Sequence, residues 1–473
     1  MKRSLVLLLC ATALVAGACG AKGDDNGAAQ GASTTAAQGA STTAADAGEK
    51  FGDLASPCGS GTAKLKAGEG PATAGEIAIG VGNDRSSTIR PGLNKELWDA
   101  SNSFAKWCND QGGISGLKIK IVDLDAQLLQ VQAAMTKACT SVFAMVGGAF
   151  VQDDQEFTGQ PGSDFHKCKL IDVPAFAVSV KKSESNGQVQ PIPNPAYKKS
   201  TGWIMDFKKL YPTESKKNVV VYGDLPSLKV VKAQYDAAVK SVGGIEAVPA
   251  ISYPVAGLTD WGPLADKVVA SGATSMYYVG EPANLANIMA ALKLKNWTGK
   301  VLNETNIYDD QVFAKGAASV EGILVRLPFT PFEEASSNPA LQQYLDNLKA
   351  YDPKAKAASL GIQSTSAWLL FASAAKKCAA DNGGVIDRTC VLTTAKTFTD
   401  WTAGGLHAPN DPGSKNPTQC SLLIEAKGGK WVRKYPEVGG TDDDQDGYHC
   451  PADSAATVTE DLGQGAVDPS RPV

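Results

Sequence analysis

An acidic run near the end of the chain has the residue types and spacing of a calcium-binding loop. Asp442, Asp444 and Asp446 alternate before Gly447, and Asp453 lies twelve positions from the start. Alternating carboxylates followed by a glycine are typical of an EF-hand loop. However, no helical periodicity flanks the run, and a cysteine within it is expected to be in a disulfide. We therefore predict a solvated acidic loop and no metal site, with calcium as the alternative.

Residues for catalysis are scarce. The three histidines, His166, His407 and His449, are scattered along the sequence, which gives no basis for a zinc site or a histidine-based catalytic system. The sequence lacks a Gly-x-Ser-x-Gly elbow, a phosphate-binding Gly-x-x-x-x-Gly-Lys loop and a His-Glu-x-x-His motif. We expect no enzymatic activity and no cofactor. The net charge of -4 gives no case for a nucleic-acid partner.

The amino terminus indicates export. Lys2 and Arg3 precede an apolar run, 5–16, that is too short to span a bilayer. Residues 16–19, Ala-Gly-Ala-Cys, resemble a bacterial lipobox, in which cleavage leaves Cys19 as the lipidated first residue; an ordinary signal peptide is the alternative. We expect a signal peptide over 1–18 and a flexible Gly/Ala/Ser/Thr-rich tether over 19–70. The body would lie outside the cytoplasm, held to the cell membrane by the lipid alone.

Eight further cysteines, at 58, 108, 139, 168, 378, 390, 420 and 450, indicate disulfides, because their number is even and the protein is exported. Spacing alone allows about 105 pairings.

The elements that would position a site begin with a β-α-β unit. The apolar run 77–81 predicts a strand, and apolar residues at three- and four-residue steps from Gly92 predict a helix. The helix should end at Gly112 and Gly113, where glycine can adopt the left-handed conformation. An alternating strand, 117–123, follows. The loop after the first strand then lies at the carboxyl edge of the sheet, where open α/β proteins bind ligands.

The β-α pattern continues in two series that a proline-rich segment, 191–195, separates. The first series adds strands 142–148 and 174–179 with helices 127–140 and 154–170. The second has strands at 219–222, 248–252, 274–279, 300–303 and 322–326 with helices between them. Near-continuous apolar strands indicate parallel sheets with helices on both faces, and 473 residues suggest two domains. We therefore expect an α/β protein of two similar halves.

These elements favour one disulfide pairing. Cys139 and Cys168 lie near the ends of consecutive helices. Cys108 ends the first helix near the amino-terminal segment that carries Cys58, and the remaining four cysteines pair with their nearest neighbours. The predicted disulfides are Cys58–Cys108, Cys139–Cys168, Cys378–Cys390 and Cys420–Cys450.

Residues 109–116, Asn-Asp-Gln-Gly-Gly-Ile-Ser-Gly, resemble the Asn-x-x-Gly-Gly-Ile-x-Gly turn of type I periplasmic binding proteins, above all the branch that serves ABC importers of branched-chain amino acids. Segments 259–265, 277–280 and 360–378 also resemble family segments, and the resemblance covers 76–435. It implies two Rossmann-like lobes joined by three hinge crossings. We expect lobe 1 at 71–196 plus 328–408, lobe 2 at 197–327 plus 409–455, and a disordered tail at 456–473.

The resemblance further implies a ligand site between the lobes. Glu304 matches the acid that binds an ammonium group in amino-acid-binding relatives, and Ser179 matches a hydroxyl position. Val151 and Glu281 stand where relatives place a serine and an aromatic residue, which leaves the ligand class open. Glu304 could face a ligand donor or a protein cation such as Arg85 or Arg90. The candidate ligand-binding residues are Asn83, Arg85, Ser86, Phe150, Val151, Gln152, Val178, Ser179, Tyr197, Glu281 and Glu304.

The implied function is that of a monomeric solute-binding lipoprotein. It would capture a small polar ligand, such as an amino acid or an amide, and deliver it to an ABC permease. A ligand-sensing lipoprotein of a membrane signalling system is the alternative, and an enzyme on the same frame is a third reading.

Overall fold

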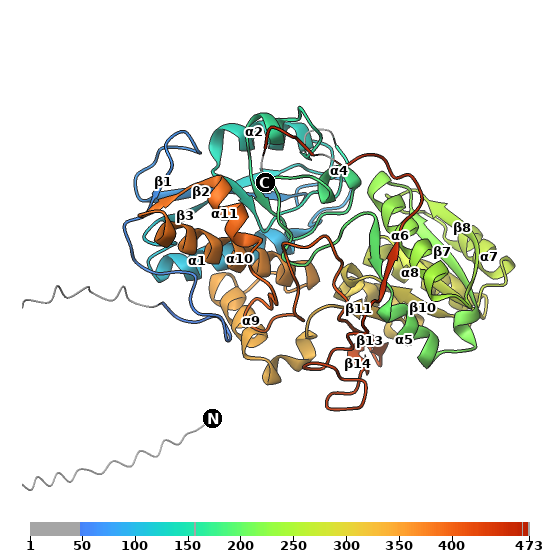
Figure 1. Ribbon diagram of the computed structural model, residues 1–473. Helices are drawn as coiled ribbons and strands as arrows, with labels where there is room; N and C mark the ends of the chain where they lie inside the picture. Colours follow the sequence, from blue (N-terminus) through green and yellow to red (C-terminus); the bar gives the residue numbers. More distant parts are fainter. Residues whose placement is uncertain (1–47, 156–157, 466, 472–473) are drawn as a thin grey trace, which may run out of the picture. The chain divides into compact units, whose positions relative to one another are not determined.

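The predicted β-α-β unit opens the first of the two larger sheets in the computed structural model, which describes residues 48–155, 158–465 and 467–471 (Figure 1). This four-stranded sheet has the order β3-β2-β4-β5 and is parallel throughout. Its strands are β2 (Glu76–Asn83), β3 (Lys118–Asp125), β4 (Ala144–Val146) and β5 (Asp172–Val173). Gly112 and Gly113 follow the first helix with φ of 109° and 86°, so they take the left-handed backbone expected of them.

The first lobe consists of this sheet and the helices that pack around it. α10 is buried along nearly its whole length and contacts α1, α11 and two strands of the sheet (Figure 1). The helices are α1 (Lys95–Asp110), α2 (Val131–Ser141), α3 (Asp164–Lys167), α4 (Val180–Ser183), α9 (Pro339–Tyr351), α10 (Ser359–Asp381) and α11 (Arg388–Ala395). A short parallel pair, β1 (Lys64–Leu65) and β12 (Val385–Ile386), lies beside them.

The second lobe is built on a seven-stranded sheet of order β14-β13-β11-β10-β9-β7-β8. The five strands from β11 to β8 are parallel, and β13 and β14 continue the sheet in antiparallel fashion. The strands are β7 (Lys217–Gly223), β8 (Glu246–Tyr253), β9 (Ser275–Val279), β10 (Lys300–Asn303), β11 (Leu324–Leu327), β13 (Leu422–Lys427) and β14 (Lys430–Tyr435). The helices are α5 (Gly202–Leu210), α6 (Pro226–Val242), α7 (Gly262–Ala270) and α8 (Pro282–Leu294).

Short elements connect the larger ones. An antiparallel pair joins β6 (Lys198–Ser200) to β15 (Ala455–Thr457). Short 3-10 helices occupy Glu214–Lys216, Thr305–Ile307, Asp310–Lys315, Ala317–Ser319 and Phe332–Ser337. The expected helix 154–170 is reduced to α3, and the expected strand 174–179 to β5. Pro174 cannot donate a ladder hydrogen bond, and the backbone amides of Val178 and Ser179 bind the Asp153 carboxylate instead.

Both ends of the body are more ordered than the sequence predicted. The tether was expected to reach residue 70, but Phe51 is buried and packs edge-on against Trp107, with 5.6 Å between ring centroids. The tail was expected to be disordered from residue 456, but β15 pairs with β6, and the Arg471 guanidinium donates to the Leu170 carbonyl at 2.5 Å. Cys19 lies outside the described residues.

Four disulfides link cysteines in the predicted pairs: Cys58–Cys108, Cys139–Cys168, Cys378–Cys390 and Cys420–Cys450. No helix within the described residues combines the length and apolar character needed to cross a membrane.

Candidate ligand-binding cavity

A cavity of about 230 Å³ receives residues from both lobes. Several of them follow the carboxyl ends of parallel strands, as expected for an open α/β protein: Glu281 comes after β9, Glu304 after β10 and Pro328 after β11. The lining residues of the first lobe are Arg90, Asn94, Glu96, Val151, Ala175, Phe176, Val178, Lys356, Leu360 and Gln363. The second lobe and the segments that join the lobes contribute Ile192–Asn194, Lys199, Ser200, Ser227, Leu228, Val231, Gln234, Val279–Pro282, Glu304–Asn306, Asp309, Arg326, Pro328 and Pro417.

Glu304 lines this cavity, and its carboxylate is already engaged by protein donors. Lys199 Nζ lies 2.7 Å from Oε1, which also accepts a hydrogen bond from the Tyr277 hydroxyl at 2.8 Å. Arg326 Nη1 donates to Oε2 at 3.0 Å. Burial alone would raise the pKa of Glu304, but the two cations hold that pKa at about 2. Its cationic partners are therefore Lys199 and Arg326, and not Arg85 or Arg90, the two protein cations that the sequence suggested as one alternative.

Three aromatic side chains, those of Trp203, Tyr235 and Tyr277, pack together on one side of this charge cluster and form an aromatic wall. The rings of Tyr235 and Tyr277 stack with centroids 3.7 Å apart, and Trp203 packs against both. Arg326 lies over the Trp203 ring. The wall keeps water away from one side of the cluster, so burial lowers the pKa of Lys199 although Glu304 opposes the change.

A second group of charges bridges the lobes. Arg90 of the first lobe pairs with Glu281 of the second. Lys356 lies 3.1 Å from the Glu96 carboxylate on α1 and 2.7 Å from the Asp309 carboxylate in the second lobe. Burial, together with the neighbouring carboxylates, raises the pKa of Glu281 although Arg90 opposes the change. These ion pairs connect the two walls of the cavity.

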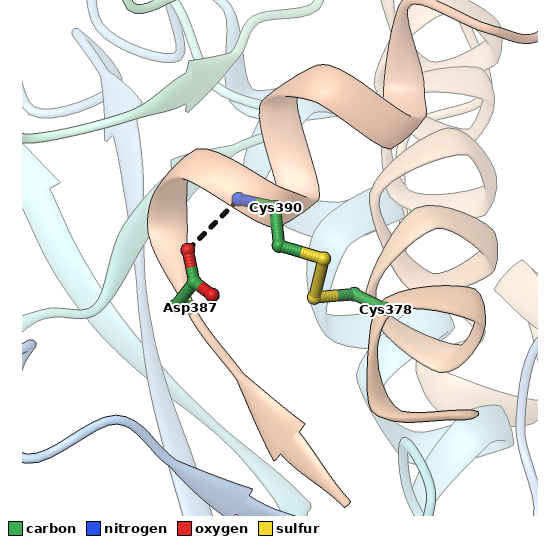
Figure 2. A group of neighbouring side chains, drawn as sticks. All are labelled: Cys378, Asp387 and Cys390. Atoms are coloured by element: carbon green, nitrogen blue, oxygen red, sulfur yellow. Dashed lines mark hydrogen bonds between the residues drawn. A yellow bond between two sulfur atoms is a disulfide. The ribbon is translucent and has the colours of Figure 1, made fainter. Parts of the chain in front are cut away.

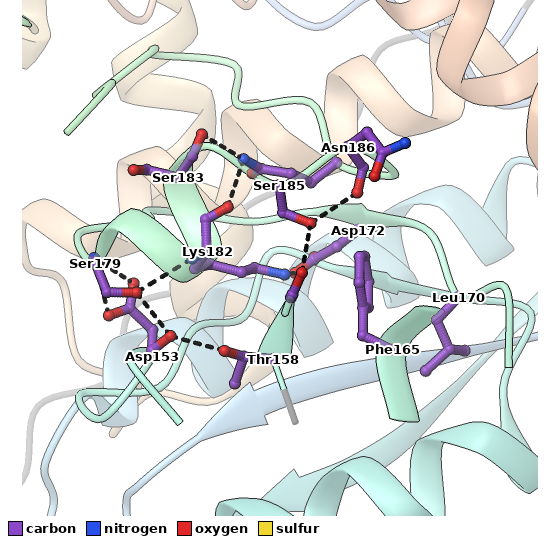
Figure 3. A network of polar contacts seen from close by, with 12 residues as sticks. Asp153, Thr158, Phe165, Leu170, Asp172, Ser179, Lys182, Ser183, Ser185 and Asn186 are labelled. Atoms are coloured by element: carbon purple, nitrogen blue, oxygen red, sulfur yellow. Dashed lines mark hydrogen bonds and ion pairs between the residues drawn. The ribbon is translucent and has the colours of Figure 1, made fainter. Parts of the chain in front are cut away.

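Two buried aspartates fix the loops of the first lobe. Asp153 accepts a hydrogen bond from the backbone amide of Val178 at 2.6 Å. It also accepts one from the backbone amide of Ser179, which lies beside it in Figure 3. Asp84 accepts from the amide of Val151 at 2.8 Å. Burial raises the pKa of both Asp84 and Asp153 to about 6. Through these bonds the two carboxylates position Val151 and Val178, which line the cavity.

Of the candidate residues, the structure brings Val151, Val178, Glu281 and Glu304 together at the cavity and leaves the other seven outside its lining. Arg85 pairs with Asp123 at 2.6 Å, because that acid lies near the carboxyl end of the adjacent strand β3. Ser179 caps α4. The remaining five are Asn83, Ser86, Phe150, Gln152 and Tyr197. Asn83 accepts a hydrogen bond from Arg85, Phe150 is buried, and the Tyr197 hydroxyl donates to the Gly463 carbonyl.

Lys199 and Arg326 were missed at the sequence level. Arg326 had a detectable signal, since it is a cation at the end of an apolar strand. Lys199 had none, because it follows an irregular proline-rich segment.

The described residues contain one group with three metal-ligand side chains close together, and a disulfide occupies it. Cys378 and Cys390 are bonded to each other, so neither sulfur is a free thiolate (Figure 2). Asp387 caps α11 by accepting from the Cys390 amide at 2.8 Å.

Carboxylates of the acidic loop, 442–453, form hydrogen bonds and an ion pair with other groups of the protein. Asp442 pairs with Lys209, Asp443 accepts from two glycine amides, and Asp444 accepts from the Cys450 amide, each at 2.7 Å.

Known structures share this architecture at low sequence identity. A leucine binding protein from Thermotoga maritima is 16% identical with a TM-score of 0.59, and the match covers 76% of this chain and 98% of that one. A fatty acid ABC transporter substrate-binding protein from Thermomonospora curvata is 17% identical with a TM-score of 0.64, and the match covers 82% and 97%. A solute binding protein from R. palustris in complex with 4-hydroxybenzoate is 18% identical with a TM-score of 0.57, and the match covers 76% and 96%.

These likenesses confirm the two-lobed fold expected from the sequence. A comparison with curated proteins found no match. The model of the family described as periplasmic binding protein matches residues 173–430. Because that match spans more than half of the 473 residues, the chain belongs to the periplasmic binding protein family.

Proposed function

We propose that this protein captures a small solute in the cavity between its lobes and delivers it to the permease of an ABC importer. The observation that carries the proposal is the cavity itself, which both lobes line and which ion pairs bridge at Arg90–Glu281 and Lys356–Asp309. A solute that contacts both walls stabilises the closed arrangement, and a permease can recognise that arrangement.

Relatives of the same fold support a transport role and suggest ligand classes. Leucine, a fatty acid and 4-hydroxybenzoate are the ligands that their descriptions name. We extend to this chain the role of a monomeric, non-enzymatic binding protein outside the cytoplasm, anchored by a lipid on Cys19. The proposed crossings between the lobes lie at 196–197, 327–328 and 408–409.

A melting-temperature screen against amino acids, amides, aromatic acids and fatty acids tests the proposal, because a ligand that binds only the folded state raises the melting temperature. Leu228→Trp fills the cavity and should abolish the shift. Val269→Trp adds the same side chain on the exposed face of α7 and should preserve it. A shift that survives in Leu228→Trp would place binding elsewhere and refute the proposed site.

A further inference from the structure

We propose that the ligand is a carboxylate with an apolar body, and that Lys199 and Arg326 bind its carboxylate group. This inference rests on the proposed function and specifies its substrate class. The sequence suggested that Glu304 binds an ammonium group of the ligand. The inference instead assigns a negatively charged group of the ligand to Lys199 and Arg326, on the second-lobe side of the cavity.

The charge count of the cluster leaves one cation in excess. Lys199 and Arg326 share a single carboxylate, Glu304, and both oxygens of that carboxylate already accept hydrogen bonds or ion pairs. The side chains of Lys199 and Arg326 are only 7% and 11% exposed. An uncompensated charge that is mostly withdrawn from water is unfavourable, so the cluster favours the arrival of an anion.

Both cations retain donors that can bind that anion. An ammonium group has three donors, and Lys199 Nζ has one ion-pair partner within the described chain. Arg326 uses Nη1 for Glu304, while Nε is buried and has no hydrogen-bond partner among the described residues. A guanidinium binds a carboxylate best through two parallel hydrogen bonds. Glu304 itself cannot donate a hydrogen bond to the ligand's carboxylate, because its low pKa keeps it ionised.

The second charge group directs an anion toward Lys199 and Arg326. Around Arg90 and Lys356 stand three carboxylates, those of Glu96, Glu281 and Asp309. Carboxylates exceed cations there by one, so a ligand carboxylate would be repelled. Of the two charge groups that line the cavity, the cluster at Glu304 is therefore the one that suits a carboxylate.

The rest of the lining suits an apolar body. Aliphatic and aromatic side chains from both lobes line the cavity: Val151, Phe176, Val178, Leu228, Val231, Val279 and Leu360. Burying apolar ligand surface against such side chains is favourable, whereas a second charged group would lose its hydration there. A monocarboxylic acid meets both requirements.

The test uses straight-chain, branched and aromatic monocarboxylic acids, each with the primary amide and the amine of the same carbon skeleton. Isothermal titration calorimetry at neutral pH should show binding of acids and at least about tenfold weaker binding of their amides and amines, because a charge-assisted bond is lost. For an acid that binds, Lys199→Met should reduce affinity at least about tenfold. The variant leaves Glu304 and Arg326 as a balanced pair, so no uncompensated charge remains in the cluster.

Two further variants separate charge from structure. Lys199→Met combined with Glu304→Gln leaves Arg326 as the single charge of the cluster, so the cation excess returns and acid binding should recover relative to Lys199→Met alone. Lys229→Met removes an exposed lysine that pairs with Asp224 on the surface, and it should bind the acid like the wild type.

The outcomes distinguish the inference from the function. If amides or amines bind and Leu228→Trp blocks them, the function stands and the carboxylate assignment is overturned. The assignment also falls if an acid binds equally well to the wild type and to Lys199→Met. If no acid, amide or amine binds, the proposed function and the inference fall together.

Discussion

The carboxylate of Glu304 lies between Lys199 Nζ, at 2.7 Å, and Arg326 Nη1, at 3.0 Å. The sequence could predict that Glu304 reaches the cavity, because it follows a short apolar strand. It could not predict the partners, since Lys199 lies in a three-residue strand, β6, whose pairing with β15 joins distant parts of the chain. Arg85, the cation suggested by the sequence, instead binds Asp123.

Glu304→Gln should lower the free energy of unfolding by about 3 kcal/mol at neutral pH without any ligand. The pKa of Glu304 is about 2 in the folded protein, against 4.5 for an ordinary glutamate side chain. The stabilisation is therefore complete above pH 4.5 and is lost as the pH falls toward 2. Urea unfolding of the wild type and the variant at several pH values measures the difference.

Glu246→Gln is the matched control, because Glu246 is 65% exposed and pairs with Lys217 at the surface. It should change stability by less than about 1 kcal/mol. If Glu304→Gln were as stable as the wild type at neutral pH, the ion pairs of Glu304 would not contribute to the fold.

At the scale of the elements, the regular β-α units were predictable and the irregular loops were not. The strand 77–81 and the helix that ends before Gly112 are present as β2 and α1, because apolar periodicity and glycine conformation define them locally. The segment after Asp153 departs from its prediction. There, the conformation depends on one buried carboxylate that binds distant backbone amides, a contact that periodicity cannot reveal.

The amino-terminal segment should owe its attachment largely to Cys58–Cys108. That disulfide closes a loop of 50 residues, and loop entropy assigns it about 4 kcal/mol, against about 3 kcal/mol for Cys378–Cys390 with a separation of 12. Replacing each pair by serines should therefore destabilise the protein more at Cys58–Cys108. Thermal unfolding of the two double variants compares them, and equal losses would contradict the loop-length argument.

For the whole molecule, the order of the elements indicated two similar α/β halves, because alternating strands and helices restrict the topology. The family resemblance, and not the element order, implied a ligand site between them. The packing of residues 48–70 and of the carboxyl-terminal segment was not predictable. Both segments lack periodicity and are held by several contacts, among them those of Phe51 and Arg471, with residues far away in the sequence.

Lys356 should hold the closed arrangement of the lobes, since its ammonium contacts Glu96 and Asp309 on opposite walls. Lys356→Met should speed ligand dissociation and weaken affinity about tenfold. Stopped-flow kinetics with an acid from the calorimetric series measures the rate. Lys354→Met, at a neighbouring exposed lysine, should dissociate at the wild-type rate, and equal rates for both variants would exclude the bridging role.

The measurement that tests the central claim most directly is small-angle X-ray scattering of the wild type with and without a saturating carboxylic acid from that series. If the ligand binds between two lobes that close around it, the radius of gyration should decrease on binding. The decrease should be smaller in Lys356→Met at saturation, because one bridge between the walls is missing. A radius of gyration that is unchanged by a saturating acid would contradict closure of the lobes around a ligand.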